Sequence, residues 1–376
     1  MSDKMPLNTK NSLENSLPDT LIARRKDEHL KIAAEHDVSH SFGTLLNDIK
    51  LVHQALPELN SAEVDLSVEF FGKKLSAPLM ITSMTGGSES AGKMNRSMAK
   101  AANKLGIAFA VGSQRVMLNH PETTSDFQVR REIPDGVLLG NIGAVQLQEY
   151  SAEVIAGLVD TIDADGLCIH LNAAQELVQK EGHRDFRGLL DKIARLVDRF
   201  EGKALIKETG AGLSPETLRK LKSIGAHYVD VSGAGGTSWT KVETYRDSNS
   251  ELFKLGETLA DWGLPTAFCI IAAKKILDDD ACIIASGGIK SGLDAARAIA
   301  AGSNIAGFAR QALLSFIKDE DNGVAALIEQ TIKELKTTML LTDCKDINAL
   351  KKAPRIYTGQ LRHWLADYGW LEGEKN

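Results

Sequence analysis

Four polar residues near the middle of the chain have types that could support chemistry, and they follow a short apolar run at 166–169. They are His170, Asn172, Gln175 and Glu176. Side chains two residues apart on a strand share a face, so His170 and Asn172 should point the same way. An imidazole, two amides and a carboxylate would then surround one opening where a buried strand ends. The alternative is a satisfied hydrogen-bond pair at a strand end, and the ends of the other strands decide between these interpretations.

Two cationic residues also lie at or just after the end of an apolar run, and they indicate an anionic ligand. Lys207 closes the apolar run 204–206, where a lysine is unusual unless an anionic partner lies near it. Arg115 follows an earlier apolar run together with Ser113, and a guanidinium beside a hydroxyl suits a phosphate group. A solvated surface charge is the alternative interpretation of Arg115.

Eight short apolar runs, most of them followed by a glycine-containing turn, must position these groups. The runs are almost continuously apolar, as expected of parallel strands covered on both faces, and roughly 20 to 55 residues separate them, which is enough for a crossover helix. Eight such units predict an α/β fold, a (β/α)8 TIM barrel with an N-terminal extension. A doubly wound sheet is the alternative, but residues 84–87 do not match a dinucleotide fingerprint. The runs are 78–81, 107–111, 137–139, 167–169, 204–206, 228–231, 282–285 and 305–309.

Glycines after the last two runs predict a phosphate site. Residues 287–288 are Gly-Gly, and residues 309–310 close the final run before a helical pattern begins. Loops after strands seven and eight, with a helix N-terminus, commonly hold phosphate in such barrels. Residues 235–237, Gly-Gly-Thr, add amides and a hydroxyl. Because the basic cluster 24–26 and Arg115 lie elsewhere in the chain, we expect a phosphorylated cofactor and a separate anionic substrate.

Composition restricts the class of protein. The chain has 376 residues and a formal net charge of -6, which argues against non-specific nucleic-acid binding. Its four cysteines are widely spaced, which favours reduced thiols and a cytoplasmic location. The N-terminus has no apolar segment typical of a signal peptide, and no stretch reaches transmembrane length, so we expect no membrane contact.

The chain is expected to form one domain. We predict a flexible tail over 1–20 and a single barrel domain over 21–376, with an N-terminal lid segment. The stretch 233–261 is polar and rich in glycine, so we expect a long active-site loop there. Residues 353–370 are expected to form a helical C-terminal cover.

Seven short segments, in this order along the chain, resemble the type 2 isopentenyl-diphosphate isomerases, which depend on FMN. Residues 173–174, Ala-Ala, stand where that family more often has Pro-Leu, and Thr209 occupies a variable position. Both differences concern the geometry of the neighbouring loops. The matching segments are Arg25-Lys26-Asp27-Glu28-His29, Ser83-Met84-Thr85-Gly86-Gly87, Gly112-Ser113-Gln114-Arg115, His170-Leu171-Asn172 with Gln175-Glu176, Lys207-Glu208, Gly235-Gly236-Thr237 and Ser286-Gly287-Gly288-Ile289.

The resemblance implies four groups of site residues. Gln175, His170 and Asn172 would be catalytic, with Gln175 near the reacting alkene, and Glu176 would help to hold Mg²⁺. The diphosphate of a small-molecule substrate would meet Arg25, Lys26, Ser113, Gln114, Arg115 and Gln175. FMN would contact Ser83, Met84, Thr85, Ser113, Asn141, Lys207, Thr237, Gly287, Gly288, Ala309 and Arg310. NADPH would reduce the flavin, and the enzyme is expected to be a homo-oligomer, a tetramer or an octamer.

The chemistry of the residues agrees with this implied activity. Moving a double bond by one carbon means adding a proton at one end and removing another, and an unactivated alkene protonates through a tertiary cation. A reduced flavin can stack on that cation and exchange protons, so no strong side-chain acid is required. Mg²⁺ prefers hard oxygen ligands and phosphates, which suits Glu176. Arg115 alone is a small counter-charge for a diphosphate, so Arg25 and Lys26 are expected to act as a lid.

Two other functions remain open at this point. An FMN-dependent hydroxy-acid oxidoreductase would share the barrel and the phosphate site, but it needs a base and an arginine for a carboxylate. A flavin-binding barrel that serves as a sensor or scaffold would not need so polar an opening.

Overall fold

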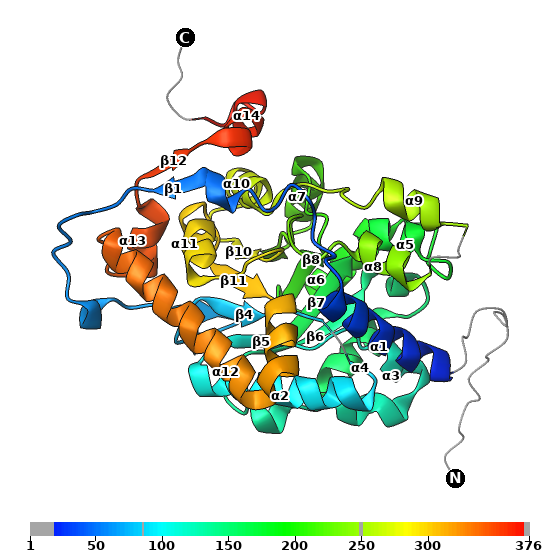
Figure 1. Ribbon diagram of the computed structural model, residues 1–376. Helices are drawn as coiled ribbons and strands as arrows, with labels where there is room; N and C mark the ends of the chain where they lie inside the picture. The colour runs from blue at the N-terminus through cyan, green and yellow to red at the C-terminus, as the bar shows by residue number, and fades with distance from the viewer. Residues whose placement is uncertain (1–18, 85, 248–250, 372–376) are drawn as a thin grey trace.

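Eight parallel strands close into a barrel in the computed structural model, which describes residues 19–84, 86–247 and 251–371 (Figure 1). Their order around the barrel is their order in the chain, and the last strand pairs with the first. Each of the eight apolar runs forms one strand, which confirms the predicted barrel. The strands are β4 (Leu79–Ile81), β5 (Ala108–Ala110), β6 (Leu138–Gly143), β7 (Gly166–Leu171), β8 (Ala204–Glu208), β9 (Tyr228–Asp230), β10 (Cys282–Ala285) and β11 (Ile305–Phe308).

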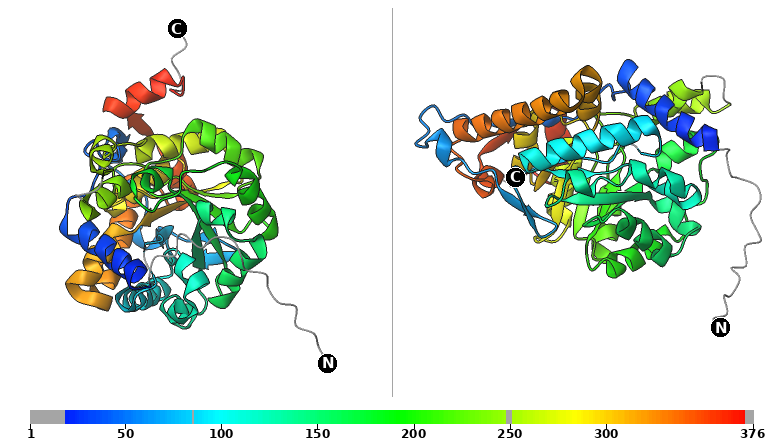
Figure 2. Two further views of the ribbon diagram at one scale, coloured as in Figure 1. Left: turned by 90° about the vertical axis from the view of Figure 1, so that its right-hand side faces the viewer. Right: turned by 90° about the horizontal axis from the view of Figure 1, so that it is seen from below.

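A helix follows every barrel strand, and together the helices surround the sheet (Figure 2). Local signals set their ends: Ser88 caps the first of them through the N–H of Ala91, and Gly106 ends it in the left-handed conformation. The last contains non-helical residues at Asp319 and Glu320, so it consists of two helices joined at a kink. These helices are α2 (Glu89–Leu105), α3 (Arg115–Asn119), α4 (Ala152–Thr161), α5 (Ala173–Val178), α6 (Leu189–Arg199), α7 (Pro215–Ser223), α10 (Thr266–Ile276), α11 (Gly292–Ala300) and α12 (Arg310–Leu341).

A hairpin of β2 (Val68–Phe70) and β3 (Lys73–Leu75) closes the N-terminal end of the barrel. Phe70 and Phe71 are buried there, and the ring of Phe71 stacks on Tyr228 at 4.0 Å. They belong to one apolar cluster with inward-facing residues of the strands, such as Met80 and Leu205. The lower part of the barrel is therefore filled, and polar side chains gather at the opposite, C-terminal end of the strands.

The N-terminal extension runs along the barrel from one end to the other. Helix α1 (Asp19–Glu35) lies at the end where the barrel strands finish, beside α8 (Trp239–Arg246) and α12. Farther along, β1 (Ile49–Leu51) pairs antiparallel with β12 (Arg355–Tyr357), which ties the extension to the C-terminal segment. Short 3-10 turns complete the description: η1 (Leu46–Asp48), η2 (Ser61–Glu63), η3 (Pro121–Asp126), η4 (Arg130–Glu132) and η5 (Ala144–Gln148).

Two segments differ from the sequence-based prediction. The stretch expected to be a loop over 233–261 contains α8 (Trp239–Arg246) and α9 (Phe253–Thr258). The C-terminal cover is partly a strand, because β12 lies between α13 (Ile347–Lys352) and α14 (Gly359–Asp367). The predicted tail over 1–20 lies outside the described residues except for its last two, which begin α1.

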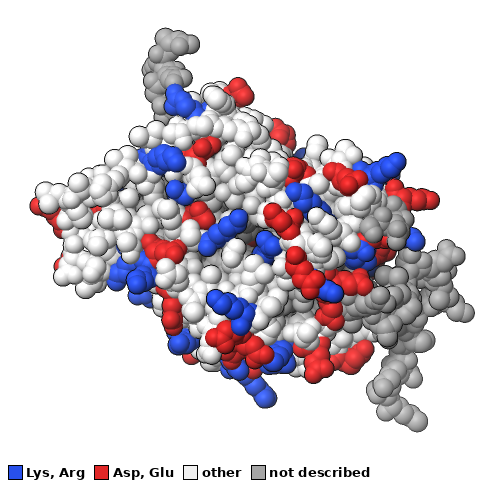
Figure 3. Space-filling view, viewed as in Figure 1, with Lys and Arg blue, Asp and Glu red and all other residues white. Residues whose placement is uncertain are grey.

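The cysteines, the hydropathy of the helices and the surface charges agree with what the composition indicated. All four cysteines are buried and unpaired, as predicted. Across the described ranges, we find no helix with the length and hydropathy needed to span a bilayer. On the face shown in Figure 3, basic side chains are interspersed with acidic ones.

Candidate active site

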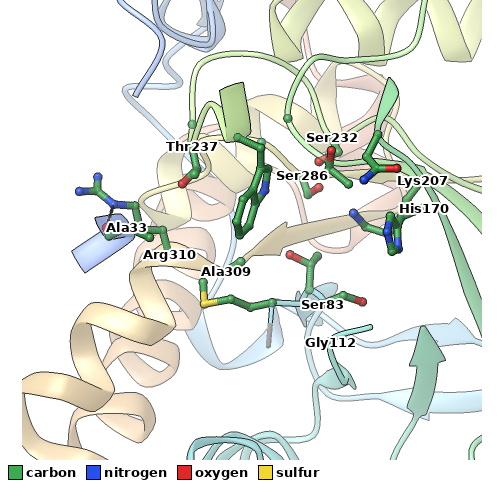
Figure 4. Close-up of a pocket in the computed structure, with 18 of the residues that line it drawn as sticks. Ala33, Ser83, Gly112, His170, Lys207, Ser232, Thr237, Ser286, Ala309 and Arg310 are labelled. Atoms are coloured by element: carbon green, nitrogen blue, oxygen red, sulfur yellow. Dashed lines mark hydrogen bonds between the residues drawn. The ribbon is translucent and has the colours of Figure 1, made fainter. Parts of the chain in front are cut away.

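A cavity lies at the C-terminal ends of the barrel strands, and residues following all eight strands and from α1 line it (Figure 4). The structure brings most of the predicted site residues together there. Arg25, as a side chain, and Thr85 lie outside the described residues. Those that line the cavity are Lys26, Ser83, Met84, Ser113, Arg115, Asn141, His170, Asn172, Gln175, Glu176, Lys207, Thr237, Gly287, Gly288, Ala309 and Arg310.

The glycine turn after β10 has the geometry of a phosphate cradle. Gly287 and Gly288 have φ values of 93° and 81°, which favour glycine. A Cβ on Gly236 would lie 2.5 Å from the nitrogen of Gly288, so the loops after β9 and β10 pack backbone against backbone. Next to them, α12 begins after Ala309, which provides no side-chain cap. The first N–H groups of that helix are thus suited to an anion.

Lys207 is a buried cation, with 5% of its surface exposed, at the end of β8. Its Nζ donates to the carbonyl of Glu208 at 2.5 Å. Asp230, 1% exposed, stands opposite Lys207 in the register of β8 and β9, and it provides the anionic neighbour that the sequence suggested. Burial raises the pKa of Asp230, while the charge of Lys207 opposes that rise. Asp230 also accepts a hydrogen bond from the hydroxyl of Ser286 at 2.7 Å.

His170 is a neutral imidazole. Burial, together with the charge of Lys207, lowers its pKa to about 3. Its Nδ1 lies 2.8 Å from Oδ1 of Asn141, and because an amide oxygen only accepts, Nδ1 carries the proton. Nε2 therefore keeps its lone pair. At neutral pH this side chain is a hydrogen-bonding group and not an acid.

Gln114 does not reach the cavity. Its side chain is fully buried, its Nε2 donates to the carbonyl of Leu158 at 2.9 Å, and its Oε1 accepts the N–H of Asn141 at 3.0 Å. The expected contact between Gln114 and a diphosphate is therefore absent from this arrangement. Gln114 fixes the part of β6 from which Asn141 contacts His170, so the role of Gln114 here is to position Asn141.

The amide of Gln175 is fixed at both ends. Its Nε2 donates to Oε1 of Glu243 at 2.9 Å, and its Oε1 accepts from Nδ2 of Asn172 at 3.3 Å. Glu243 is buried on α8, with Nε of Arg246 at 2.7 Å and Nε2 of His29 at 3.0 Å. The contact with His29 has the distance of an ion pair but not the direction of a hydrogen bond.

Glu243 is a site residue that the sequence did not identify. Burial works against its ionisation, but the charges of His29 and Arg246 and the hydrogen bond from Gln175 together lower its pKa to about 2. It lies in the segment predicted to be a loop, and nothing in the residue spacing distinguished it from the other acidic residues there. The position of Glu243 depends on α8, which packs against both α1 and α5.

Glu176 is the buried carboxylate of the opening. Its Oε1 accepts from Asn172 at 3.0 Å and its Oε2 accepts the N–H of His183 at 2.7 Å. The imidazole of His183 also contacts Glu149, and its Nε2 lies 2.9 Å from Oε1 of that carboxylate. Within the described residues, no group of three or more His, Cys, Asp or Glu side chains could hold a metal ion. A magnesium ion here would need most of its ligands from a phosphate group and water.

Lys26 reaches from α1 across the opening. Its Nζ donates to the carbonyls of Gly86 and of Ser113, the latter at 3.1 Å. Asp27 accepts hydrogen bonds from Ser88 and Ser90 on the same side. The loops after β4 and β5 thus hold the N-terminal half of α1 in place.

Comparison with known proteins assigns the fold and the relatives of this chain. The FMN-dependent dehydrogenase family model matches residues 27–120 and 159–356. An isopentenyl-diphosphate delta-isomerase of Methanopyrus kandleri is 38% identical over 342 residues, covering 91% of this chain and 93% of the relative. Relatives with the same name from Thermococcus onnurineus and a Nostoc species are 41% and 42% identical, covering 91% and 87% of this chain and 93% of each relative.

Solved structures of oxidases share the fold. A lactate oxidase of Pediococcus acidilactici superposes with a TM-score of 0.65 at 14% identity, covering 92% of this chain and 96% of that one. A mandelate oxidase superposes with a TM-score of 0.61 at 13% identity, covering 91% of this chain and 99% of the other. At that identity the likeness concerns the architecture alone.

Proposed function

We propose that this chain interconverts isopentenyl and dimethylallyl diphosphate at a reduced FMN. The premise is that the chain belongs to the FMN-dependent dehydrogenase family and, within it, to the isopentenyl-diphosphate delta-isomerases. One observation carries the proposal. The cavity combines a glycine cradle beside the start of α12 with a separate set of cations, Lys26 and Arg115. The first suits the phosphate of a cofactor, and the second suits the diphosphate of a substrate.

The residues present fit FMN. The hydroxyl of Ser83 is buried without a hydrogen-bond partner among the described residues, so a ligand would satisfy it. The ammonium group of Lys207 lies at the same opening and would face a ring carbonyl or an anionic ring. When bound and reduced by NADPH, the flavin would supply an electron-rich ring beside the alkene and a route for proton exchange.

The substrate diphosphate is assigned to the cations above that ring. Lys26 and Arg115 would neutralise its charge, and Glu176 would offer Mg²⁺ one hard oxygen ligand while the phosphates and water offer the others. A single buried carboxylate with both oxygens already accepting N–H groups is a weak site without phosphate. The metal would therefore bind together with the substrate.

The remaining residues of the cavity would orient the substrate and exclude water. Gln175 has one fixed orientation because Glu243 and Asn172 hold its two ends, so it presents the same amide to the alkene at every turnover. His170 is neutral, and the lone pair of its Nε2 would accept a hydrogen bond without charging the site. Leu30 and Ala33 of α1 line the cavity, and they would help to keep water from a reactive cation.

A hydroxy-acid oxidase is the second candidate, because the oxidases share this architecture. Such an enzyme needs a base that removes a proton from the substrate. With a pKa lowered to about 3, His170 is a weak base. The relatives at about 40% identity are named isomerases, which also favours the first candidate.

The test is anaerobic incubation of the pure protein with FMN, NADPH, Mg²⁺ and isopentenyl diphosphate. We expect dimethylallyl diphosphate to form in large excess over the NADPH consumed, since the reaction has no net redox change. Consumption of one NADPH per product would refute the proposal. Absence of isomerisation, together with oxygen uptake when lactate or mandelate is supplied in a separate aerobic assay, would also refute it. We also propose a cytoplasmic enzyme, supported by its unpaired cysteines, and a homo-oligomer, which light scattering can check.

A further inference from the structure

Arg310 begins α12 at the proposed phosphate cradle, but its guanidinium turns away toward α1 (Figure 4). Its Nε donates to the carbonyl of Ala33 at 2.7 Å, and its Nη2 donates to the carbonyl of His36 at 2.9 Å. Ala33 lies in the last turn of α1, and His36 follows the end of that helix. Carbonyl groups at a helix C-terminus have no partner within the helix and carry the negative end of its dipole, so a guanidinium is well matched to them.

The same helix carries Lys26 near its middle. Lys26 and Ala33 are seven residues apart, which is roughly 10 Å along a helix. Lys26 contacts the carbonyls of Gly86 and Ser113 at the proposed diphosphate site. Helix α1 is therefore held over the opening at two places, by its own lysine near its middle and by Arg310 at its C-terminal end.

We propose that Arg310 is a positioning residue whose guanidinium holds α1 so that Lys26 stays over the diphosphate, while its main chain forms part of the phosphate cradle. This inference rests on the proposed function. It differs from the direct FMN contact that the resemblance implied for Arg310, because both hydrogen-bonding nitrogens face carbonyls of the N-terminal segment. Arg310 would then belong to the phosphate cradle through its main chain and support the lid segment, α1, through its side chain.

The test compares Arg310→Gln, which removes the charge and the fork of donors, with Arg310→Lys, which keeps the charge. Arg297→Gln is a matched control, because Arg297 also ties a barrel helix to the N-terminal extension, donating to Asn47 at 2.7 Å, but it does not line the cavity. Hydrogen–deuterium exchange of residues 26–36 is measured at saturating FMN. FMN affinity and the steady-state constants for isopentenyl diphosphate are measured in parallel.

Losing two hydrogen bonds from a charged donor should speed exchange in α1 by about tenfold or more in Arg310→Gln. The KM for isopentenyl diphosphate should rise more than kcat falls, and Arg310→Lys should recover part of both effects. Arg297→Gln should match the wild type. Unchanged exchange in α1, or faster exchange with an unchanged KM, would overturn the inference.

The exchange experiment needs no turnover. If the wild type fails to isomerise isopentenyl diphosphate, the proposed function is wrong, while α1 exchange still reports whether Arg310 holds the helix. If Arg310→Gln binds FMN at least tenfold more weakly and α1 exchange is unchanged, the guanidinium is a phosphate ligand.

Discussion

Replacing Gln114 with methionine separates a positioning role from a substrate contact. Methionine has a similar length and an unbranched shape, so the side chain fits the same space without the amide. The change removes the donor to Leu158 and the acceptor for Asn141, which are 2.9 and 3.0 Å away. Both backbone groups would remain buried without those partners.

The magnitude follows from those two groups. A buried polar group left unsatisfied costs about 1–3 kcal/mol, so two of them cost about 2–6 kcal/mol. Folded domains are stable by only about 5–15 kcal/mol, so the loss is a large fraction of the total. The end of β6 should also loosen, and with it the hydrogen bond between Asn141 and His170.

Urea unfolding of the apoprotein, followed by circular dichroism, measures the effect without linkage to the cofactor. Gln128→Met is the matched control, because the side chain of Gln128 is exposed and donates a hydrogen bond to the carbonyl of Thr161. The control should change stability by less than about 0.5 kcal/mol. A Gln114→Met variant as stable as the wild type but with a raised KM for isopentenyl diphosphate would refute the positioning role and restore a diphosphate contact.

Three further outcomes follow from the site. Lys207→Ala should weaken FMN binding roughly ten- to hundredfold in a fluorescence titration, because a charge-assisted hydrogen bond contributes about 1.5–3 kcal/mol; unchanged affinity would argue against a flavin contact. Glu176→Gln should raise the Mg²⁺ concentration needed for half-maximal rate while FMN content stays constant, and an unaltered Mg²⁺ dependence would make Glu176 structural. The pKa of Glu243 falls from 4.5 to about 2 on folding, so its stabilisation is complete above pH 4.5 and is lost as the pH falls toward 2. Glu243→Gln should therefore reduce the slope of unfolding free energy against pH in that window, and an unchanged slope would contradict the lowered pKa.

The barrel was predictable because its signal repeats. A parallel strand covered on both faces is a short, almost continuous apolar run, and every such run became a strand at nearly the expected residues. The order of the strands around the barrel then placed the ends of β7, β8 and β10 at one opening, so His170, Lys207 and Gly287 could be assigned together.

The directions of individual side chains were not predictable. Gln114 lies between Ser113 and Arg115, which both line the cavity, yet its own side chain points into the protein between neighbouring elements. Helix α8 is rich in polar and β-branched residues and lacks a clear apolar face, so its sequence favoured a loop. Because α8 was not expected from the sequence, the side chain of Glu243 could not be placed, and its contact with Gln175 could not be inferred.

The β2–β3 hairpin that closes the N-terminal end of the barrel has a consequence for the order of events in catalysis. With Phe70 and Phe71 packed below the strands, ligands approach the described cavity from the side of α1. In the proposed function, a flavin seated on the cradle would enter before a diphosphate bound above it. The nicotinamide that reduces the flavin would need the space later taken by the isoprenoid chain. Reduction would thus come first and use the same entrance as the later turnovers, so substrate in excess would slow the reduction of the flavin but not the isomerisation that follows it.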